Sequence, residues 1–322
     1  MFYAFRKMKF LERRVWLRRV FGRLSYRVFF ALDRVGLHLL PKHYYTPVAD
    51  YSWLRKNPEA WMDRTNLACV HWALDEQLDW LRKICEPHHH EVVGLDWYHE
   101  ISFGGWGVWG YGPIDAQVLH CFVRHYAPAT VVEIGSGIST ACILRASRIN
   151  EREGQRRSRI VSIEPFPTPK LQEQKEIALI EEVCQKVPRS VFDELKAGDL
   201  LFIDSSHTLK LGSELARIYL DIIPDLPPGV FIHIHDIYLP YLYMRTALSN
   251  YYDWQETSLV LALLKNNTRL SVQCCLSALH YDRPKQMATL LTEYRPEANI
   301  EGLQAAKADK GHFPCSLWLR TS

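Results

Sequence analysis

Short apolar runs alternate with helix-compatible segments through the second half of the chain. Four runs rich in Val, Ile, Leu and Phe lie at residues 130–134, 159–164, 199–204 and 229–235. Near-continuous apolar runs of this length are typical of parallel strands that are buried on both faces of a sheet. Their alternation with helical segments predicts an α/β domain with a Rossmann-like, mostly parallel sheet.

Helices are expected in the segments between these runs, as alternating elements of the domain. We expect helices at residues 138–149, 169–178, 209–223 and 240–265, the last broken near residues 250–253. A short strand is expected near 179–184, and further strands at 269–275 and 315–320. Pro113 is expected to open a helix, with Asp115 complementing the helix dipole.

The N-terminal third has a different character and divides into two parts. Residues 1–45 form a basic segment that is compatible with a helix, and residues 46–112 follow before the sheet domain, residues 113–322. Within 46–112 we expect a proline-containing connector, a cap helix at 59–85 and a Gly- and Trp-rich loop at 95–113. Because glycines supply mobility and aromatic side chains supply a cover, this loop is a candidate lid.

Composition limits the class of protein. The 322 residues are 48% hydrophobic and 23% charged, as in soluble globular proteins. No apolar run is long enough to predict a membrane-spanning helix. The eight cysteines form no C-x-x-C pair, which favours reduced thiols and a cytoplasmic location. Cys85 and His88–His90 could suggest a metal site, but adjoining histidines rarely face one ion, so we interpret them as a solvated linker.

Charge is segregated along the chain. Residues 1–45 carry eleven basic and two acidic residues, a net charge of +9, whereas the remainder carries −6. One interpretation is a helix that lies on an anionic surface, such as the inner membrane, or docks on an acidic partner. The other is a solvated helix whose apolar side chains pack on the body of the protein. The sequence leaves both open, and it does not indicate an oligomeric state.

The stretch Thr130–Ser139 (TVVEIGSGIS) carries the clearest sign of a ligand. Gly135 and Gly137 allow a tight turn from a strand into a helix and a close approach by a ligand, although an ordinary turn has the same pattern. Acids end three successive strands, at Glu133, Glu164 and Asp204. Carboxylates repel the pyrophosphate of NAD but suit the cationic groups and ribose hydroxyls of S-adenosylmethionine.

The third glycine of the dinucleotide fingerprint is replaced by Thr140, which also favours S-adenosylmethionine over NAD. The residues predicted to bind the cofactor are Glu133, Gly135, Ser136, Gly137, Ser139, Glu164 and Asp204.

Four motifs together resemble a bacterial family of class I S-adenosylmethionine-dependent methyltransferases. They are EIGSG-x-ST at Glu133–Thr140, IEP at Ile163–Pro165, FIDSSH at Phe202–His207 and GV-x-IHIHDI-x-LPY at Gly229–Tyr241. The resemblance extends from about Trp97 to the C-terminus. It implies a sheet that ends in an antiparallel pair of strands, and it says little about the acceptor substrate.

Polar residues at the exits of the fourth and fifth strands are the candidates for catalysis. Asp204, His207, His235 and Asp236 lie there, at the binding edge of such a sheet, whereas His233 is expected to be a hydrogen-bonded core residue. In related metal-dependent O-methyltransferases, carboxylates from these strand ends hold magnesium. The resemblance therefore implies a Mg²⁺ site at Asp204, His235 and Asp236, in which His235 replaces an oxygen ligand.

Without an ion, His207 would act as the base, with Asp204 and Asp236 positioning it. We expect methyl transfer to a hydroxyl of a sugar or another small molecule, with no nucleic-acid partner. Two alternatives stay open: a non-catalytic methyltransferase-like scaffold held at a membrane, and an oxidoreductase on the same fold.

Overall fold

The computed structural model describes residues 25–40, 45–107, 110–245, 247–249, 252–291, 293–299, 302–305 and 314–322. The chain divides into two units, Met1–Pro58 and Glu59–Ser322. In the first, residues 25–33 are helical and α3 spans Tyr51–Leu54. Most of the predicted basic helix, residues 1–24, lies outside the described residues.

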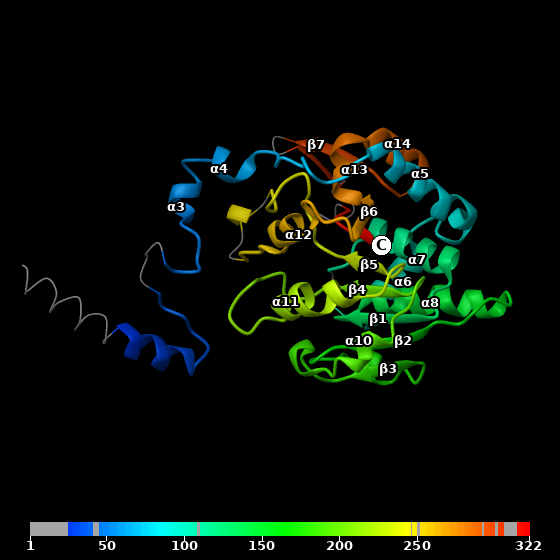
Figure 1. The fold of residues 1–322 in the computed structure, drawn as a ribbon, viewed down its shortest axis with the longest axis horizontal. Helices are drawn as coiled ribbons and strands as arrows, with labels where there is room; N and C mark the ends of the chain where they lie inside the picture. The colour runs from blue at the N-terminus through cyan, green and yellow to red at the C-terminus, as the bar shows by residue number, and fades with distance from the viewer. Residues whose placement is uncertain are drawn as a thin grey trace, which may run out of the picture. The chain divides into compact units, whose positions relative to one another are not determined.

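The second unit is built on a seven-stranded sheet (Figure 1). Its strands are β1 (Thr130–Ile134), β2 (Arg159–Ile163), β3 (Ile177–Ile180), β4 (Leu200–Ile203), β5 (Phe231–Ile234), β6 (Leu270–Cys275) and β9 (Leu317–Thr321). They lie in the order β3-β2-β1-β4-β5-β9-β6. β1 to β5 are mutually parallel, and β9 is antiparallel to both β5 and β6. The predicted mostly parallel sheet with an antiparallel C-terminal strand is confirmed.

Alternate residues of each strand pack against helices on opposite faces, because side chains point to opposite sides of a strand. Val131, Phe202 and Trp318 belong to the core under α5 (Leu74–Cys85), α6 (Asp96–Ser102), α7 (Pro113–Tyr126) and α8 (Ile138–Arg152). Val132, Ile203 and Leu317 belong to the core under α10 (Ser190–Asp193), α11 (Glu214–Arg217), the π-helical turn η3 (Ile218–Ile222) and α12 (Glu256–Leu264).

Further elements surround the sheet and the helices that cover its two faces. They are α4 (Glu59–Met62), the 3-10 turn η1 (Glu86–Glu91), α9 (Pro169–Gln172), η2 (Cys184–Lys186), η4 (Ile223–Asp225), η5 (Ala247–Ser249), α13 (Leu276–Asp282) and α14 (Pro284–Leu290). A separate hairpin pairs β7 (Pro296–Asn299) with β8 (Gly302–Ala305).

Several predicted helices are wrong in extent. The predicted helix 59–85 is two helices, α4 and α5, because residues 63–73 leave helical geometry and Cys69 has a φ of +68°. The predicted helix 240–265 is limited to α12 and the short η5 in its described part, and helix 169–178 to α9. Conversely, the predicted loop 95–113 begins with α6, since its glycines occur only after Ser102.

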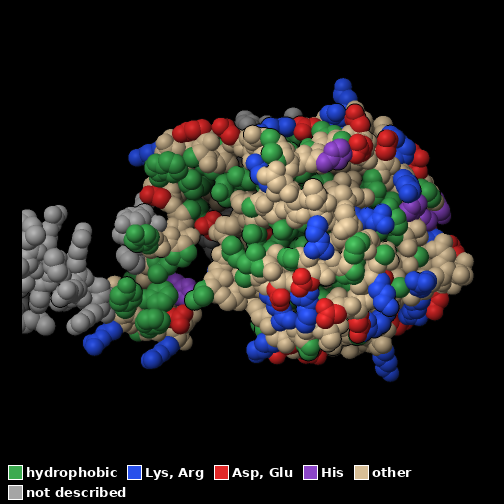
Figure 2. Space-filling model, in the orientation of Figure 1, with side chains coloured by type: hydrophobic (Ala, Val, Ile, Leu, Met, Phe, Trp, Pro, Cys, Tyr) green, Lys and Arg blue, Asp and Glu red, His purple; other side chains and the backbone are tan. Residues whose placement is uncertain are grey.

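The eight cysteines are all free in the structure. None of the helices in the described part of the chain is long and apolar enough to cross a membrane. Acidic and basic side chains are interspersed over the lower part of the sheet-containing unit in Figure 2. Arg189 pairs with Asp193, Asp221 and Asp225.

Candidate active site

Two glycines turn the chain from β1 into α8 at the carboxyl edge of the sheet. The φ of Gly135 is +99°, and a Cβ atom there would come closer than 3.0 Å to the carbonyl oxygen of Asp204. Gly137, with a φ of +142°, is the N-cap of α8, and its N–H donates to Thr140 Oγ1 at 2.9 Å. Because strand order reverses beside β1, this edge is where a ligand crevice forms in such sheets.

Glu133, the last polar residue of β1, lies beneath this turn and is fully buried. The hydroxyl of Ser139 donates to its Oε1 at 2.7 Å, and that of Thr140 to its Oε2 at 2.6 Å. Burial raises the pKa of Glu133 to about 8, against the lowering effect of these two hydrogen bonds. Glu133 is therefore mostly uncharged at neutral pH, and it holds the start of α8 against β1.

Glu164, directly after β2, has a different environment. Its Oε2 accepts a hydrogen bond from Ser136 Oγ at 3.0 Å, and its Oε1 accepts one from the backbone N–H of Phe166 at 2.8 Å. The side chain is only partly buried. The structure thus joins two of the predicted cofactor residues, Ser136 and Glu164, across the ends of β1 and β2.

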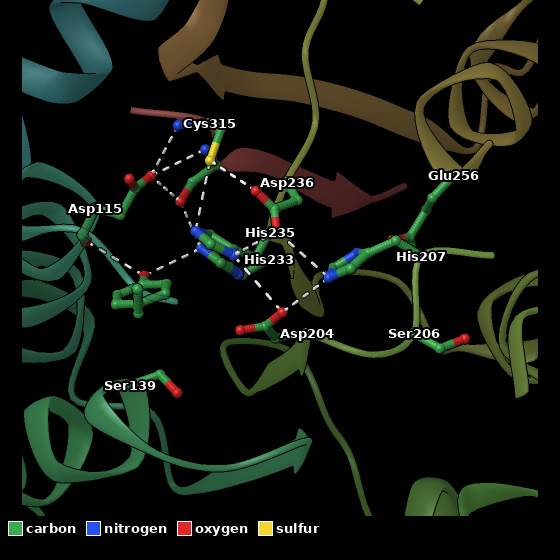
Figure 3. A network of polar contacts seen from close by, with 12 residues as sticks. Asp115, Ser139, Asp204, Ser206, His207, His233, His235, Asp236, Glu256 and Cys315 are labelled. Atoms are coloured by element: carbon green, nitrogen blue, oxygen red, sulfur yellow. Dashed lines mark hydrogen bonds and ion pairs between the residues drawn. The ribbon is translucent and has the colours of Figure 1, made fainter. Parts of the chain in front are cut away.

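A second group of predicted residues meets at the ends of β4 and β5. His207 Nε2 lies 3.3 Å from Asp204 Oδ1 and 3.4 Å from Asp236 Oδ2. His235 Nδ1 lies 3.6 Å from each of the same two oxygens. Figure 3 shows the two imidazoles on opposite sides of the gap between the two carboxylates. We call these four residues the Asp–His cluster.

The backbone positions the cluster from unusual conformations. Both His207 and Asp236 have a φ of +57°, which is uncommon for residues other than glycine. The carbonyl of His207 accepts hydrogen bonds from the N–H groups of Gln255 and Glu256, which tie it to the start of α12. Such conformations persist where the surroundings hold them, and they concentrate at functional sites.

Electrostatic coupling in the Asp–His cluster is strong. Burial alone would raise the pKa of Asp204, but the charges and hydrogen bonds of His235 and His207 hold it well below its usual range. Burial lowers the pKa of both imidazoles, and the neighbouring carboxylates outweigh this effect. The net pKa of His235 is about 9, and that of His207 is well above its usual value. Without an ion, these shifts favour the positively charged, doubly protonated form of both imidazoles at neutral pH.

Residues that the sequence analysis missed surround the cluster. Glu256, on α12, accepts a hydrogen bond from His207 Nδ1 at 2.7 Å and another from the hydroxyl of Tyr219 at 2.7 Å. The ring of Trp254 lies 4.5 Å from that of His207, centroid to centroid. Glu256 is 49 residues from His207 and belongs to no motif, so only the packing of α12 could have revealed it.

On the β5 side, a buried network holds His235 and Asp236. The Tyr238 hydroxyl donates to Asp236 Oδ1 at 2.9 Å, and Cys315 Sγ lies 3.3 Å from the same oxygen. Asp115 is buried and accepts hydrogen bonds from the backbone N–H groups of Cys315 and Ser316 and from the Ser316 hydroxyl. Its carboxylate therefore anchors the segment before β9, in addition to lying in the first turn of α7.

His233 is a core residue, as predicted. It is fully buried, its ring stacks on Phe202 with centroids 4.2 Å apart, and its Nε2 contacts Ser316 Oγ at 2.9 Å and the Tyr111 hydroxyl at 3.2 Å. We assign it a packing role.

Two groups of described residues have potential metal-ligand atoms within 4.8 Å of one another. They are Asp204, His207 and Asp236, and Asp115, His235 and Cys315. The predicted metal ligands Asp204, His235 and Asp236 are also close together, at the distances given above. His88, by contrast, pairs with Glu91 in η1, and no metal-ligand group forms among the described residues there.

The order of the strands, the antiparallel final pair and the ligand edge at β1, β2, β4 and β5 define a Rossmann-like fold of the methyltransferase type. Residues 132–237 match a family model described as a methyltransferase domain. This match spans the Gly135 turn, Glu164 and the whole Asp–His cluster.

A protein of Archaeoglobus fulgidus described as uncharacterized is 29% identical over 184 residues, which cover 52% of this chain and 78% of that protein. Among solved structures, an O-methyltransferase from Bacillus cereus in complex with SAH is 11% identical, with a TM-score of 0.42 and coverage of 76% and 100% of the two chains. The O-methyltransferase TomG from Streptomyces achromogenes, in complex with SAM, is 11% identical, with a TM-score of 0.39 and coverage of 79% and 92%. Likenesses this distant assign no activity.

Proposed function

We propose that this protein transfers a methyl group from S-adenosylmethionine to a hydroxyl of a small molecule, such as a sugar. The observation that carries the proposal is that two groups of polar residues meet at Gly135, and we call them the two half-sites. On one side lies the Ser136–Glu164 pair, and on the other lies Asp204, whose carbonyl oxygen packs against Gly135. The family match over residues 132–237 supports the same function.

The first half-site suits the nucleoside of the cofactor. The partly exposed carboxylate of Glu164 is an acceptor for ribose hydroxyls, and the Ser136 hydroxyl holds it in place. The glycines leave room for the cofactor to approach the backbone. Glu133 would not contact the cofactor with a charged group, since its carboxyl is buried and uncharged; its proposed role is to shape the turn.

The second half-site suits the acceptor and the reacting methyl group. The ionised carboxylate of Asp204 would face the cationic end of the cofactor. Methyl transfer is an in-line displacement in which the hydroxyl oxygen forms a bond to carbon as the sulfonium bond breaks, so alignment is the main task. His207 is the proposed base in its neutral form, which its raised pKa makes scarce at neutral pH and more abundant as the pH rises. Glu256 occupies its Nδ1, and this leaves Nε2 toward the carboxylates.

Magnesium fits this site poorly. Mg²⁺ prefers six oxygen ligands in octahedral geometry. The cluster offers two carboxylates and two imidazoles, and the imidazole of His235 takes the place of the oxygen ligand that Mg²⁺ prefers. We therefore derive no step through magnesium.

Calorimetry with S-adenosylhomocysteine tests the cofactor assignment. We expect the wild type to bind it and not NADH, and Glu164→Gln to bind it about 10- to 100-fold more weakly, because hydrogen bonds to a charged acceptor contribute about 1.5–3 kcal/mol. Glu173→Gln, on the exposed surface beyond α9, is the matched control and should bind normally. Binding of NADH without S-adenosylhomocysteine would support the oxidoreductase alternative and refute the proposal.

Transfer of labelled methyl from the cofactor to a panel of glycosides and other alcohols tests the activity. His207→Ala is expected to lower turnover by about two to four decades with little change in cofactor affinity, because a positioned base contributes about that much. A protein that binds the cofactor but methylates neither the panel nor any component of a cell extract would be the non-catalytic scaffold.

A further inference from the structure

The first unit, Met1–Pro58, exposes more large apolar side chains than its size accounts for. Of the sixteen such side chains that are exposed among the described residues, nine belong to residues 26–53. None of the described residues of this unit is buried. The unit therefore holds apolar side chains that its described part does not remove from water, and exposed apolar surfaces of this kind mark sites of interaction.

We propose that this unit docks on an anionic lipid bilayer through residues 25–40, which we call the apolar–basic surface. Its exposed apolar side chains are Tyr26, Val28, Phe30, Val35, Leu37 and Leu39, and its exposed basic side chains are Arg27 and Arg34. Figure 2 shows apolar and basic side chains together over this segment. The proposal goes beyond methyl transfer and does not depend on it.

The backbone gives the apolar–basic surface a defined shape. Residues 25–33 are helical, and a turn follows in which Gly36 has a φ of +77°. The backbone N–H of Leu37 donates to the carbonyl oxygen of Leu32 at 3.0 Å, which closes the helix end. Because this turn reverses the chain, the apolar side chains before and after it belong to one small structure.

Local pairing leaves the surface positively charged. The ring of His38 lies 5.3 Å from that of Phe29, centroid to centroid, and its Nε2 lies 2.8 Å from Asp33 Oδ1. Asp33 is the single acid between residues 25 and 40, and His38 holds it at the end of the helix. Arg27 and Arg34 therefore set the sign of the charge that this surface presents.

The charge of the whole segment favours an anionic occupant. Residues 1–45 carry a net charge of +9. Each basic residue close to an anionic membrane strengthens binding about fivefold, which corresponds to about 1 kcal/mol. A second copy of the chain would bring a further +9 against the same surface, so like charge disfavours self-association there.

The remainder of the chain is a poorer partner for so basic a segment. Its net charge is −6, but its acidic and basic side chains are interspersed in Figure 2. Some of its acids are already paired, as Glu176 is with Arg148 and Arg157. The negative charge is thus spread among basic side chains, whereas anionic lipid presents one sign of charge over a whole surface.

The placement of the apolar side chains favours a bilayer over a groove in an acidic protein. Tyr26 and Phe30 are four residues apart, as are Val28 and Leu32, so apolar side chains project from two sides of the helix. A groove in a protein takes a single stripe of such residues. The interface of a bilayer takes a broader apolar surface, aromatic side chains included, while arginine stems reach back to the headgroups.

Co-sedimentation of the full chain with lipid vesicles tests the proposal. We expect binding to vesicles of phosphatidylcholine and phosphatidylglycerol at about 0.1 M salt. Binding should weaken at least about 10-fold on phosphatidylcholine alone or at about 1 M salt, because the Debye length falls from about 10 to about 3 Å. Arg27→Gln/Arg34→Gln should bind about 25-fold more weakly, about fivefold for each arginine. Phe30→Ser/Leu37→Ser should bind at least about 10-fold more weakly, because two apolar side chains no longer leave water.

Two variants of the second unit are the matched controls. Lys175→Gln/Lys285→Gln removes the same charge from exposed positions outside the apolar–basic surface. Leu220→Ser removes an apolar side chain that is 73% exposed on η3. Both should bind the anionic vesicles as the wild type does. Weakening by these controls as large as that caused by the variants of residues 25–40 would overturn the proposal.

A fluorescent label distinguishes the bilayer from other occupants of the surface. An environment-sensitive dye is attached to Phe30→Cys in a Cys69→Ser background, because Cys69 is the exposed one of the eight cysteines. Its emission should shift to the blue when anionic vesicles are added, whereas the same dye on Leu220→Cys should not respond. Emission that is already shifted without vesicles would show that another part of the chain or a second copy covers the surface, and would overturn the proposal.

Two further results would also overturn it. The first is no binding to either kind of vesicle. The second is salt-sensitive binding to anionic vesicles that produces no shift of the dye and that Phe30→Ser/Leu37→Ser does not weaken. Charge alone would then hold the chain at the lipid, and the apolar side chains would face a different partner, such as an acidic protein.

Discussion

Replacing Gly135 by alanine tests whether the close approach of β1 and β4 builds the site. The added Cβ would lie closer than 3.0 Å to the Asp204 carbonyl oxygen and 3.3 Å from its carbonyl carbon. These are backbone atoms at the end of a buried strand, so they cannot rotate away as a side chain would. The substitution also places alanine at a φ of +99°, where side chains are disfavoured.

Two costs combine at this position. Backbone strain of this kind is worth about 1–3 kcal/mol. Forcing extra volume into a packed region is worth about 1–3 kcal/mol more. Gly135→Ala should therefore lower the free energy of unfolding by about 2–6 kcal/mol, which many domains with 5–15 kcal/mol of stability survive. Because the turn must move away from Asp204, the affinity for S-adenosylhomocysteine should also fall at least 10-fold.

Gly198→Ala is the matched control. Its φ is +90°, yet a Cβ there would meet nothing within 4 Å. It should therefore lose only the strain, about 1–3 kcal/mol, and keep the cofactor affinity. Urea unfolding and calorimetry on both variants measure the two effects. Equal losses of stability, together with unchanged affinity in Gly135→Ala, would refute the argument that contact with Asp204 selects glycine.

Three further predictions concern buried polar groups. Burial lowers the pKa of His120 to about 4, so between pH 6.5 and 4 the unfolded chain binds a proton that the folded chain does not. The free energy of unfolding should therefore fall on acidification by up to about 1.4 kcal/mol per pH unit. Urea unfolding at a series of pH values should show a weaker dependence of stability on pH for His120→Gln than for the wild type. Tyr219→Phe removes a buried hydrogen bond to Glu256 and should cost about 1–3 kcal/mol in urea unfolding, with no change in the fold by circular dichroism. Glu133→Gln resembles the uncharged acid and should keep S-adenosylhomocysteine affinity within about threefold by calorimetry, whereas a tenfold loss would mean that Glu133 acts as a charged group.

The central sheet could be predicted from the sequence because its strands are short apolar runs with clear ends. β1 was predicted to the residue, and β2, β4 and β5 to within two residues at either end. The error in β3 has a physical cause: a helix was expected over 169–178, but α9 ends at Gln172 and the chain re-enters the sheet at Ile177. The local sequence does not register the tertiary pairing of Ile177 with Ile160.

The error in the predicted helix over 59–85 has a different cause. Apolar residues at three- and four-residue steps predicted one helix over 59–85, yet Leu67 and Val70 reach the core from a non-helical segment. Such residues match the helical spacing of apolar positions because they are buried, although the backbone that carries them is not helical. Tertiary packing therefore overrides the local preference wherever a connecting segment crosses a core.

Sequence motifs identified some residues of the candidate site, and only the packing of the fold reveals the others. Strand-end positions identified Asp204, His235 and Asp236, since the carboxyl ends of parallel strands meet at one edge. No pattern could identify Glu256 or Tyr219, because the helical segments that carry them reach His207 only through the packing of the second core. These are the residues that orient the catalytic candidate.

The charge states of the three strand-end acids show what sequence spacing leaves undetermined. Glu133, Glu164 and Asp204 hold equivalent places in the pattern, but Glu133 meets only hydroxyls in a buried space and stays protonated near neutral pH. Asp204 meets two imidazoles and stays ionised. Because these imidazoles come from the turn after β4 and from β5, the charge at the centre of the site depends on neighbours across the sheet. A motif can thus mark where an acid lies, while the fold decides whether that acid attracts a cation or supports a turn.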